Sequence, residues 1–485
     1  MKPTAPIALS ALLLLAGCAA VGPDYERPAA NLPGAYPDAP VDLPAAVAIS
    51  ADWWKLYGDQ RLDELVASAL ARNADIRIAV ARIEETDANL REAGAAFLPE
   101  IDLVGTPQRQ RISAAAATPV PSSIPLVRND IRFALGTSYE LDFWGKLRRA
   151  LEATRASALG SRYAKEVVTL SLAGLTAQAY FSLRSLDAQV ALTRATLASR
   201  QDTLDMVRRR AVGGIASDLD LNQAELARAD ASAQLKDLQR QRALIEHQLA
   251  TLTGRLDLTL AAGDLKDLLN LPLPPQPPAG LPSTLLERRP DVLLAEQQLV
   301  AANAQIGIAK AAMFPTVSLV SYLGSQSSGL PTLMSSSAGI WSIGFGLTAP
   351  IFDAGRYAAR TQAAEARQKQ AAGIYQKSVE TAFREVADAL SSVTQLAAAE
   401  QDQRERALAA RNVLRLATLR YESGYSAYLE VLVAQAAAND AELAFVRNRL
   451  AHLAASVDLM KALGGGWDAE PMRISNAAIQ GGSGK

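Results

Sequence analysis

Apolar and polar residues alternate in two parts of the chain in the manner of β-strands. Along 131–143 and 340–352, apolar side chains occupy one parity, and small, polar or charged side chains occupy the other. An alternation with a period of two predicts strands. We therefore predict four strands, at roughly 100–107, 131–144, 316–324 and 340–352, which the loops 108–130 and 325–339 join in pairs.

The apolar parity of these strands is typical of a surface that faces lipid. It includes the aromatic residues Tyr139, Phe143, Trp341 and Phe345, whereas the other parity is small or charged. A soluble sheet with one buried face shows a similar alternation, but an aromatic-rich face opposite a polar face favours the wall of a membrane barrel. No charged residue occurs in the 42 positions of 311–352, and the prolines in this range argue against a membrane helix.

Four strands cannot close a barrel, because an open sheet edge in lipid leaves backbone groups unpaired. The chain is therefore expected to share a barrel with copies of itself. Two chains would supply eight strands and three would supply twelve. The pattern alone favours an oligomer and does not choose the number of chains.

Two segments, 146–211 and 356–421, contain no proline in 66 residues each. At about 1.5 Å per residue, each would form a helix about 100 Å long, which must pack along other helices through an apolar stripe. The remaining helices are predicted at 217–253 and 427–463, as returns, and at 73–98 and 290–314, as shorter helices that stack end to end on the returns.

Glycines mark the turns between the long helices and their returns. Gly214 and Gly424 are expected to end the long helices by adopting positive φ. Ser217 and Ser426 then lie where an N-cap is favoured.

The chain consists of two similar halves. A step of 216 residues brings Pro99 onto Pro315, and a step of 210 brings Gly145 onto Gly355 and Gly254 onto Gly464. This spacing predicts a duplicated unit of helices and a hairpin, too long for a solenoid repeat. The predicted divisions are a signal peptide at 1–17, an extended segment at 18–51, a first repeat at 52–270, a Pro-rich connector at 271–282, a second repeat at 283–463 and a tail at 464–485.

Composition limits the classes of function. With 49 Lys and Arg against 50 Asp and Glu, the net charge is −1, and nothing indicates a nucleic acid or a generally anionic partner. The histidines, His247 and His452, do not occupy matching positions in the two halves and are expected to be solvated or to face a tunnel. No metal, cofactor or nucleophile motif is recognisable, so we expect that the protein is not an enzyme.

Cys18, the single cysteine, follows a short apolar run and the small residues Ala16 and Gly17. This is the pattern of a cleaved lipoprotein signal, too short to span a bilayer. An exported protein with one cysteine cannot use it for an internal disulfide. We therefore expect covalent lipid on Cys18, a diacylglycerol and an N-acyl chain. Ala19 is not acidic, which by analogy with enteric sorting favours the outer membrane.

Several long motifs resemble the outer-membrane efflux factor family, the TolC-like exit ducts, and within it the lipoprotein branch paired with proton-driven drug pumps. The similarity covers essentially the whole mature chain. The motifs are Gly17-Cys18 with Val21-Gly22-Pro23-Asp24-Tyr25-Glu26-Arg27-Pro28, Asp52-Trp53-Trp54, Leu281 to Val292 with Glu296 and Asn303, and Arg420 to Gly424.

The resemblance implies an α+β membrane protein, in which a long antiparallel α-helical coiled-coil barrel continues a transmembrane β-barrel formed by three chains of four strands each. It also implies a belt formed by 50–72, the connector and the tail. The implied role is a passive homotrimeric conduit in the outer membrane of a Gram-negative bacterium. Its implied partners are outer-membrane lipid, a periplasmic adaptor (membrane fusion protein) and an inner-membrane proton-driven efflux transporter, with no nucleic acid.

The same resemblance suggests site residues at the turns between the long helices and their returns. The periplasmic gate is expected at Asp220, Leu429 and Glu430, because acidic rings narrow pores and favour cations. Some members have an aspartate where this chain has Val433, which makes the gate more apolar. The tips that contact the adaptor and pump are expected at Arg210, Gly214, Ser217, Arg420, Tyr421, Gly424 and Ser426. Ordinary helix capping, with first-turn acids favoured by the helix dipole, explains the same residues without a gate.

Two other classes of function are possible from the sequence. The chain could be a periplasmic coiled-coil lipoprotein with a structural or adaptor role and no pore, or a lipid-anchored enzyme. Stepwise conductance of the purified protein separates the conduit from the spacer. An enzyme would require a polar catalytic constellation, which the sequence does not offer.

Overall fold

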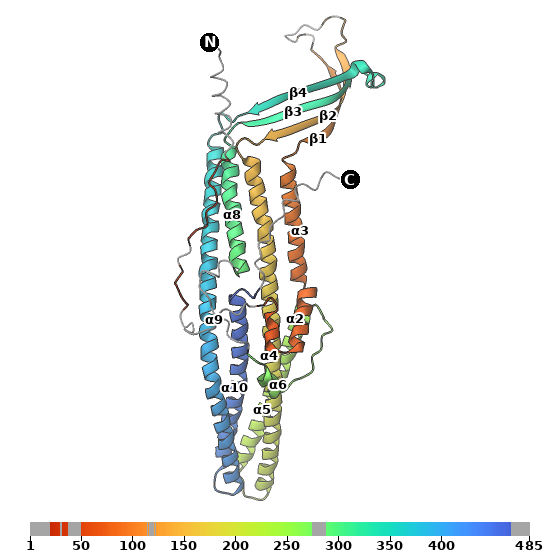
Figure 1. Cartoon of the computed structure of the whole chain (residues 1–485). Helices are drawn as coiled ribbons and strands as arrows, with labels where there is room; N and C mark the ends of the chain where they lie inside the picture. The colour runs from red at the N-terminus through yellow and green to blue at the C-terminus, as the bar shows by residue number, and fades with distance from the viewer. Residues whose placement is uncertain are drawn as a thin grey trace.

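The computed structural model describes residues 20–29, 32–36, 50–113, 115, 121, 123–273 and 288–466. The predicted signal peptide, Cys18, most of the Pro-rich connector and the tail beyond 466 lie outside the described residues. In the described part, long helices run side by side, and a curved four-stranded sheet projects from one end of them (Figure 1).

The helices of the two halves correspond in length. Helices α4 (Lys146–Val212) and α9 (Arg356–Glu422) have 67 residues each, and the returns α5 (Asp218–Leu252) and α10 (Tyr428–Ala462) have 35 each. Helices α3 (Ala74–Ala95) and α8 (Pro290–Ala311) have 22 each. These equal lengths agree with the internal repeat that the Gly and Pro spacing predicted. Among the described helices, none combines the length and apolar character needed to cross a bilayer.

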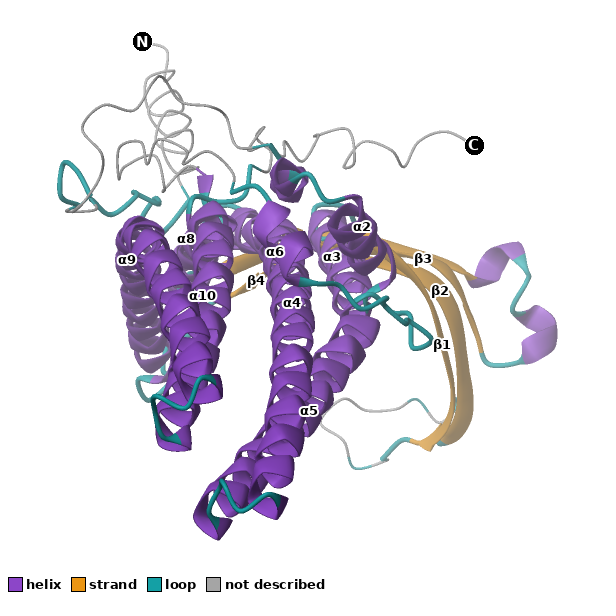
Figure 2. Cartoon of the chain, turned by 90° about the horizontal axis from the view of Figure 1, so that it is seen from below, coloured by secondary structure: helices purple, strands orange, loops and turns teal. Residues whose placement is uncertain are grey.

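Each short helix continues a return helix, as predicted. Asn73 caps α3 and donates a hydrogen bond from Nδ2 to the carbonyl of Leu252, at the end of α5, at 3.0 Å. Arg289 donates from Nη1 to the carbonyl of Ala462, at the end of α10, at 3.1 Å. Because helix ends leave carbonyls unpaired, these side chains join two stacked helices into one rod. The α8/α10 rod packs between α9 and α4, and α3 and α5 pack on α4 (Figure 2).

The sheet is antiparallel with the order β1-β2-β3-β4, and both β1 and β4 are edges. One row of partners crosses all four strands, since Leu103 pairs with Leu135, Leu135 with Leu323, and Leu323 with Trp341. We call the face that contains this row the apolar face. The strands are β1 (Glu100–Arg111), β2 (Val127–Leu141), β3 (Thr316–Ser327) and β4 (Gly339–Thr348).

The strand ends differ from the prediction. β1 extends four residues beyond 107, β2 begins at Val127 instead of 131, and β4 ends at Thr348 instead of 352. The pairing of β1 with β2 continues farther into the predicted loop 108–130 than expected, up to Ile112, whose N–H donates to the carbonyl of Leu126 at 2.8 Å. The outer parts of β1, Gln108 to Arg111, and of β2, Arg128 to Asp130, are polar or charged, so they lack the apolar alternation used to predict strands.

The two faces of the sheet differ in exposure and shape. On the apolar face, Trp341 and Phe345 are 75% and 74% exposed. The opposite face, which we call the cavity face, contains the buried Ala134 and borders a cavity of about 330 Å³. There the Arg132 guanidinium lies 4.0 Å from the centroid of the Tyr322 ring. A row of large apolar side chains that are at least half exposed in a folded chain indicates a surface that another apolar phase covers.

A belt of short elements crosses one face of the helical layer (Figure 2). It consists of η1 (Trp53–Tyr57), α2 (Gln60–Arg72) and α6 (Leu265–Asn270). Its buried side chains share one core with α4, α5 and α10. Within that core the Tyr57 ring lies 4.9 Å from the Phe181 ring, and the Tyr57 and Ser456 hydroxyls are 2.6 Å apart. The sequence-based belt included 50–72 but not the segment around α6.

Candidate functional site

The two hairpins at the far end of the helices make the same turn. Gly214 has φ of +73° and Gly424 has φ of +80°, which confirms the predicted positive φ. In each turn, the residue after the glycine donates its N–H to the carbonyl of an arginine, Ile215 to Arg210 at 2.9 Å and Tyr425 to Arg420 at 2.8 Å. Glycine is favoured here because only it adopts this backbone conformation without steric cost.

The first turn contains the predicted cap and the second does not. Ser217 caps α5, and its Oγ accepts from Asp220 N–H at 3.2 Å while Asp220 Oδ2 accepts from Ser217 N–H at 3.1 Å. The corresponding cap of α10 is Ala427, and the buried Ser426 hydroxyl makes no hydrogen bond among the described residues. The prediction that Ser426 caps α10 is therefore wrong, because the cap lies three residues after the turn glycine in both hairpins.

Arg210 joins the two hairpins. Its Nη1 donates to the carbonyl of Tyr421 at 3.2 Å, and its guanidinium lies 4.6 Å from the centroid of the Tyr421 ring. Within the second hairpin, Arg420 Nε lies 3.1 Å from Glu430 Oε1. The structure therefore brings together four of the predicted site residues, whereas Asp220 bonds within its own turn.

A groove of about 660 Å³ lies between α9 and α10 at this tip. Leu429 and Val433, one turn apart on α10, are 55% and 61% exposed there. Glu430 lines the groove but pairs with Arg420, so the free surface is mostly apolar. Val413 and Leu416 of α9 line the same groove and were not predicted from the sequence. A long helix that packs against two neighbouring helices has apolar residues on more than one face, so the residues that line a groove do not stand out in its hydrophobic periodicity.

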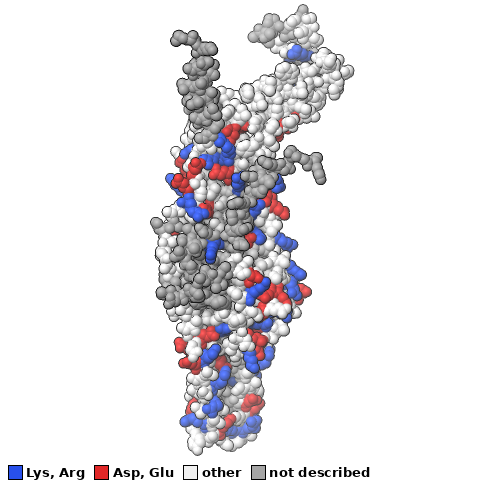
Figure 3. Space-filling model, viewed as in Figure 1, with Lys and Arg blue, Asp and Glu red and all other residues white. Residues whose placement is uncertain are grey.

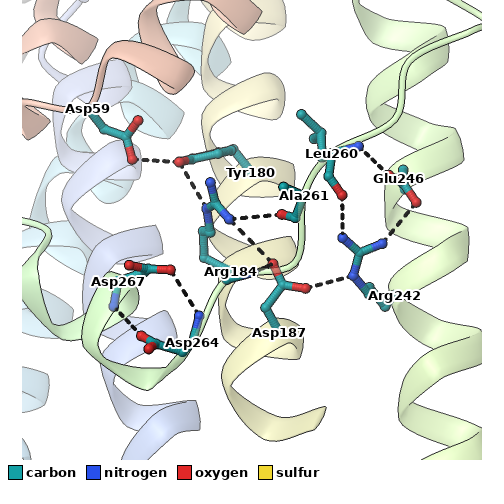
Figure 4. Close-up of polar contacts among 11 residues, drawn as sticks. Asp59, Tyr180, Arg184, Asp187, Arg242, Glu246, Leu260, Ala261, Asp264 and Asp267 are labelled. Atoms are coloured by element: carbon teal, nitrogen blue, oxygen red, sulfur yellow. Dashed lines mark hydrogen bonds and ion pairs between the residues drawn. The ribbon is translucent and has the colours of Figure 1, made fainter. Parts of the chain in front are cut away.

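A buried carboxylate fastens the belt to α4 and α5 (Figure 4). The Asp187 side chain is 0% exposed and accepts from Arg242 Nε at 2.6 Å and from Gly263 N–H at 3.0 Å. Arg242 Nη2 also donates to the carbonyl of Leu260 at 2.8 Å. Asp187 belongs to α4 and Arg242 to α5, and the backbone partners lie in the segment that leads from α5 to α6 of the belt. The ion pair and its backbone hydrogen bonds therefore connect all three. We call this cluster the first clamp.

Tyr180 and Arg184 extend the first clamp to the start of α2 (Figure 4). The Tyr180 hydroxyl donates to Asp59 Oδ2 at 2.5 Å and accepts from Arg184 Nε at 3.0 Å. Burial, followed by the bond to Asp59, raises the pKa of Tyr180, so the phenol stays neutral and remains a donor. Asp59 also caps α2 through the N–H groups of Arg61 and Leu62.

A second clamp fastens the other helical pair. Arg449 of α10 donates from Nη1 to Glu400 of α9 at 3.2 Å and from Nη2 to the carbonyl of Leu271. His452 is 5% exposed, and its Nδ1 lies 2.9 Å from Glu400 Oε2. The expectation of a solvated or tunnel-facing His452 is therefore wrong. Burial acts to raise the pKa of Glu400, but His452 and Arg449 together hold it below its usual value.

The first described residues form a strap at the junction of sheet and helices. Val21 N–H donates to the carbonyl of Trp144 at 2.9 Å. Gly22 crosses α8 so closely that a Cβ on it would lie 2.6 Å from Gly307 Cα. Any side chain at Gly22 would therefore push the strap off the helix, and its φ of +107° also favours glycine.

Ion pairs hold the rest of the strap. Asp24 pairs with Arg149 of α4 at 2.6 Å. Arg27 makes a bidentate pair with Glu296 of α8, at 2.7 and 2.8 Å, and the Tyr25 hydroxyl donates to the same carboxylate. In the sequence, this motif is recognisable only by its resemblance to the family. Its contacts could not be predicted, because the partners lie more than 120 residues away.

An elongated helical layer that continues into a sheet with one apolar face and two open edges defines a subunit of a membrane channel. A family model described as outer membrane efflux protein matches residues 65–255 and 281–465. The chain is 36% identical to outer membrane protein OprJ of Pseudomonas aeruginosa over 479 residues, which cover 96% of this chain and 97% of OprJ. It is 33% identical to the probable efflux pump outer membrane protein TtgC of Pseudomonas putida, with 94% of each chain covered.

Solved structures show the same similarity. The Campylobacter jejuni CmeC outer membrane channel superposes with a TM-score of 0.84 at 25% identity, over 93% of this chain and 96% of that one. This chain belongs to the outer membrane efflux protein family. It is an outer-membrane channel component of a Gram-negative efflux system.

Proposed function

We propose that three copies of this chain form a passive exit duct, which receives substrate from a periplasmic adaptor and an inner-membrane proton-driven transporter. The observation that supports this most is the four-stranded sheet with unpaired edges at β1 and β4. Edges in lipid must be paired, and three sheets give twelve strands, enough for an open passage. No catalytic role is proposed for any residue.

We further propose that the duct passes small organic compounds. Two Pseudomonas putida relatives, each 33% identical over 94% of this chain, are described as an antibiotic efflux pump and a toluene efflux pump outer membrane protein. The apolar groove between α9 and α10 at the tip is compatible with such cargo.

The tip would combine the gate and the docking surface. Leu429 and Glu430 line the proposed gate together with Asp220, and the turn residues around Gly214 and Gly424 meet the adaptor and pump. The link from Arg210 to Tyr421 supports this assignment, because it ties the two hairpins that must separate when the tip opens.

Arg210→Ala should open the tip. In planar bilayers, the wild-type trimer should give small stepwise conductances, and the R210A trimer should give larger ones, because the cross-hairpin bond and ring contact are lost. Arg209→Ala is the matched control, since Arg209 is an exposed neighbour on the same turn of α4. Absence of any conductance, with no heat-labile trimer on a gel, would favour a spacer lipoprotein. Equal conductance of wild type and R210A would contradict the role of Arg210 alone.

We also propose the division of the chain with a signal peptide at 1–17 and lipid on Cys18. The strap supports this, because Val21 is bonded to Trp144 at the base of the sheet. A residue three positions earlier would therefore be within reach of the membrane surface.

Cys18→Ser should abolish acylation and leave the fold intact, because the strap contacts begin after this residue. The measurement is incorporation of radioactive fatty acid, with trimer content on a gel as the control for folding. Unchanged labelling of C18S would refute the lipoprotein assignment.

A further inference from the structure

The row of β1 residues on the apolar face changes from apolar to positively charged along the strand. On the apolar face this strand reads, in order, Ile101, Leu103, Gly105, Pro107, Arg109 and Arg111. Because strand residues two apart share a face, the two arginines continue the row of exposed apolar side chains. Arg109 pairs with Asn129 and Arg111 with Val127 on β2, and both arginines are exposed.

Among the residues that the structure describes, no acidic side chain pairs with Arg109 or Arg111. In 105–135 there are four arginines and one acidic residue, Asp130. Asp130 has the parity of the cavity face, where it accepts a hydrogen bond from Gln326 at 2.7 Å. The hairpin loop 112–126 and the whole of 311–352 contain no charged residue. In Figure 3 a small blue patch lies near the outer end of the sheet, with no red beside it.

The depth of the arginines matches a lipid headgroup layer. Arg109 is eight residues beyond Ile101; at about 3.4 Å per residue and a tilt of about 40°, this separates them by roughly 20 Å across the membrane, close to the apolar band of about 25 Å. At the opposite end of the sheet, Trp144 stacks on Phe314 at 4.7 Å. Aromatic residues typically mark a membrane interface, so the arginines lie near the other interface.

We propose that Arg109 and Arg111 bind the phosphate groups of the phosphorylated glycolipid that forms the outer leaflet. An arginine fork matches phosphate oxygens in bidentate geometry, and an unpaired cation next to an anionic headgroup is favourable. The inference rests on the proposed barrel, in which three such pairs would surround the outer rim. The trimer would then be held at a fixed depth by protein–lipid ion pairs in addition to its apolar surface.

Native mass spectrometry of the full-length trimer titrated with bis-phosphorylated lipid A tests this proposal. Arg109→Gln with Arg111→Gln should weaken binding roughly 30-fold, since each arginine near an anionic surface contributes about fivefold. The double lysine variant should stay within a few-fold of wild type, because the charge remains. Arg128→Gln is the matched control: Arg128 lies at the same end of the sheet, with the parity of the cavity face, and should bind lipid A as wild type does.

Several outcomes would overturn the proposal. Equal binding by wild type and the double glutamine variant would do so, and so would equal binding of dephosphorylated lipid A. An equal loss in R128Q would show that general positive charge, not this face, attracts the lipid. Displacement by excess inorganic phosphate would identify a free-phosphate site instead. Failure of the wild type to form a conducting trimer would contradict the proposed function, whereas a normal trimer with unchanged lipid binding in the double variant would contradict only this inference.

Discussion

Gly324→Ala should prevent assembly of the barrel. A Cβ at this position would lie 2.1 Å from the Phe133 carbonyl oxygen and 2.4 Å from Ala134 Cα. Both atoms belong to the backbone of β2, so the clash can be relieved only by separating β2 from β3. Overpacking costs about 1–3 kcal/mol even where side chains can shift, so we expect the yield of heat-labile trimer to fall roughly tenfold or more. The measurement is the trimer band on an unheated gel.

Gly136→Ala provides the matched control for this experiment. Gly136 lies on the neighbouring strand, and the nearest atom to its added Cβ would be Val104 Cγ2 at 3.9 Å, an ordinary contact. Its trimer yield should equal that of wild type. Because the β2–β3 pair joins the hairpins of the two halves, normal assembly of G324A would show that these halves are not held together by close strand pairing.

Asp187→Ala should loosen the belt. The substitution removes a fully buried carboxylate and leaves the half-buried Arg242 and Gly263 N–H without it. Removing one partner of a buried ion pair typically costs about 3–5 kcal/mol. We expect the trimer to dissociate at a lower temperature and trypsin to cleave faster after the exposed Arg255, just beyond α5.

Asp202→Ala is the control for the first clamp. Asp202 lies on the same helix but is exposed, so its removal should change neither the melting of the trimer nor the rate of cleavage. If D187A melted and digested as wild type does, the first clamp would contribute nothing to the attachment of the belt.

The architecture could be predicted because it depends on periodicity and on helix breakers. Gly145, Gly214, Gly355 and Gly424 mark the helix ends in the sequence, and the helices begin or end within a few residues of them. The strands were found where apolar residues alternate. Their outer ends were missed where Arg109 and Arg111 replace apolar residues on the same face, since the alternation then concerns charge and not hydrophobicity.

The buried ion pairs of the two clamps could not be predicted from the sequence. Asp187 and Glu400 appear in the sequence as ordinary acids of long helices, yet their arginine partners lie 55 and 49 residues away. The belt around α6 is too short for a periodic signal. The sequence placed the turn residues of the tip correctly, because turn geometry is local. It misassigned the N-cap of α10 to Ser426 instead of Ala427, since the exact N-cap depends on where the first helical hydrogen bond closes.

The crossing of Gly22 over Gly307 has a consequence for the order of biogenesis. The strap contacts residues of α8 that are synthesised some 280 positions later in the chain. The strap therefore cannot make these contacts until the second half of the chain has been synthesised and folded. If Cys18 is acylated, the lipid attaches the N-terminus to the membrane before the strap can bind α8. Docking of the first-made segment would then be among the last steps of folding.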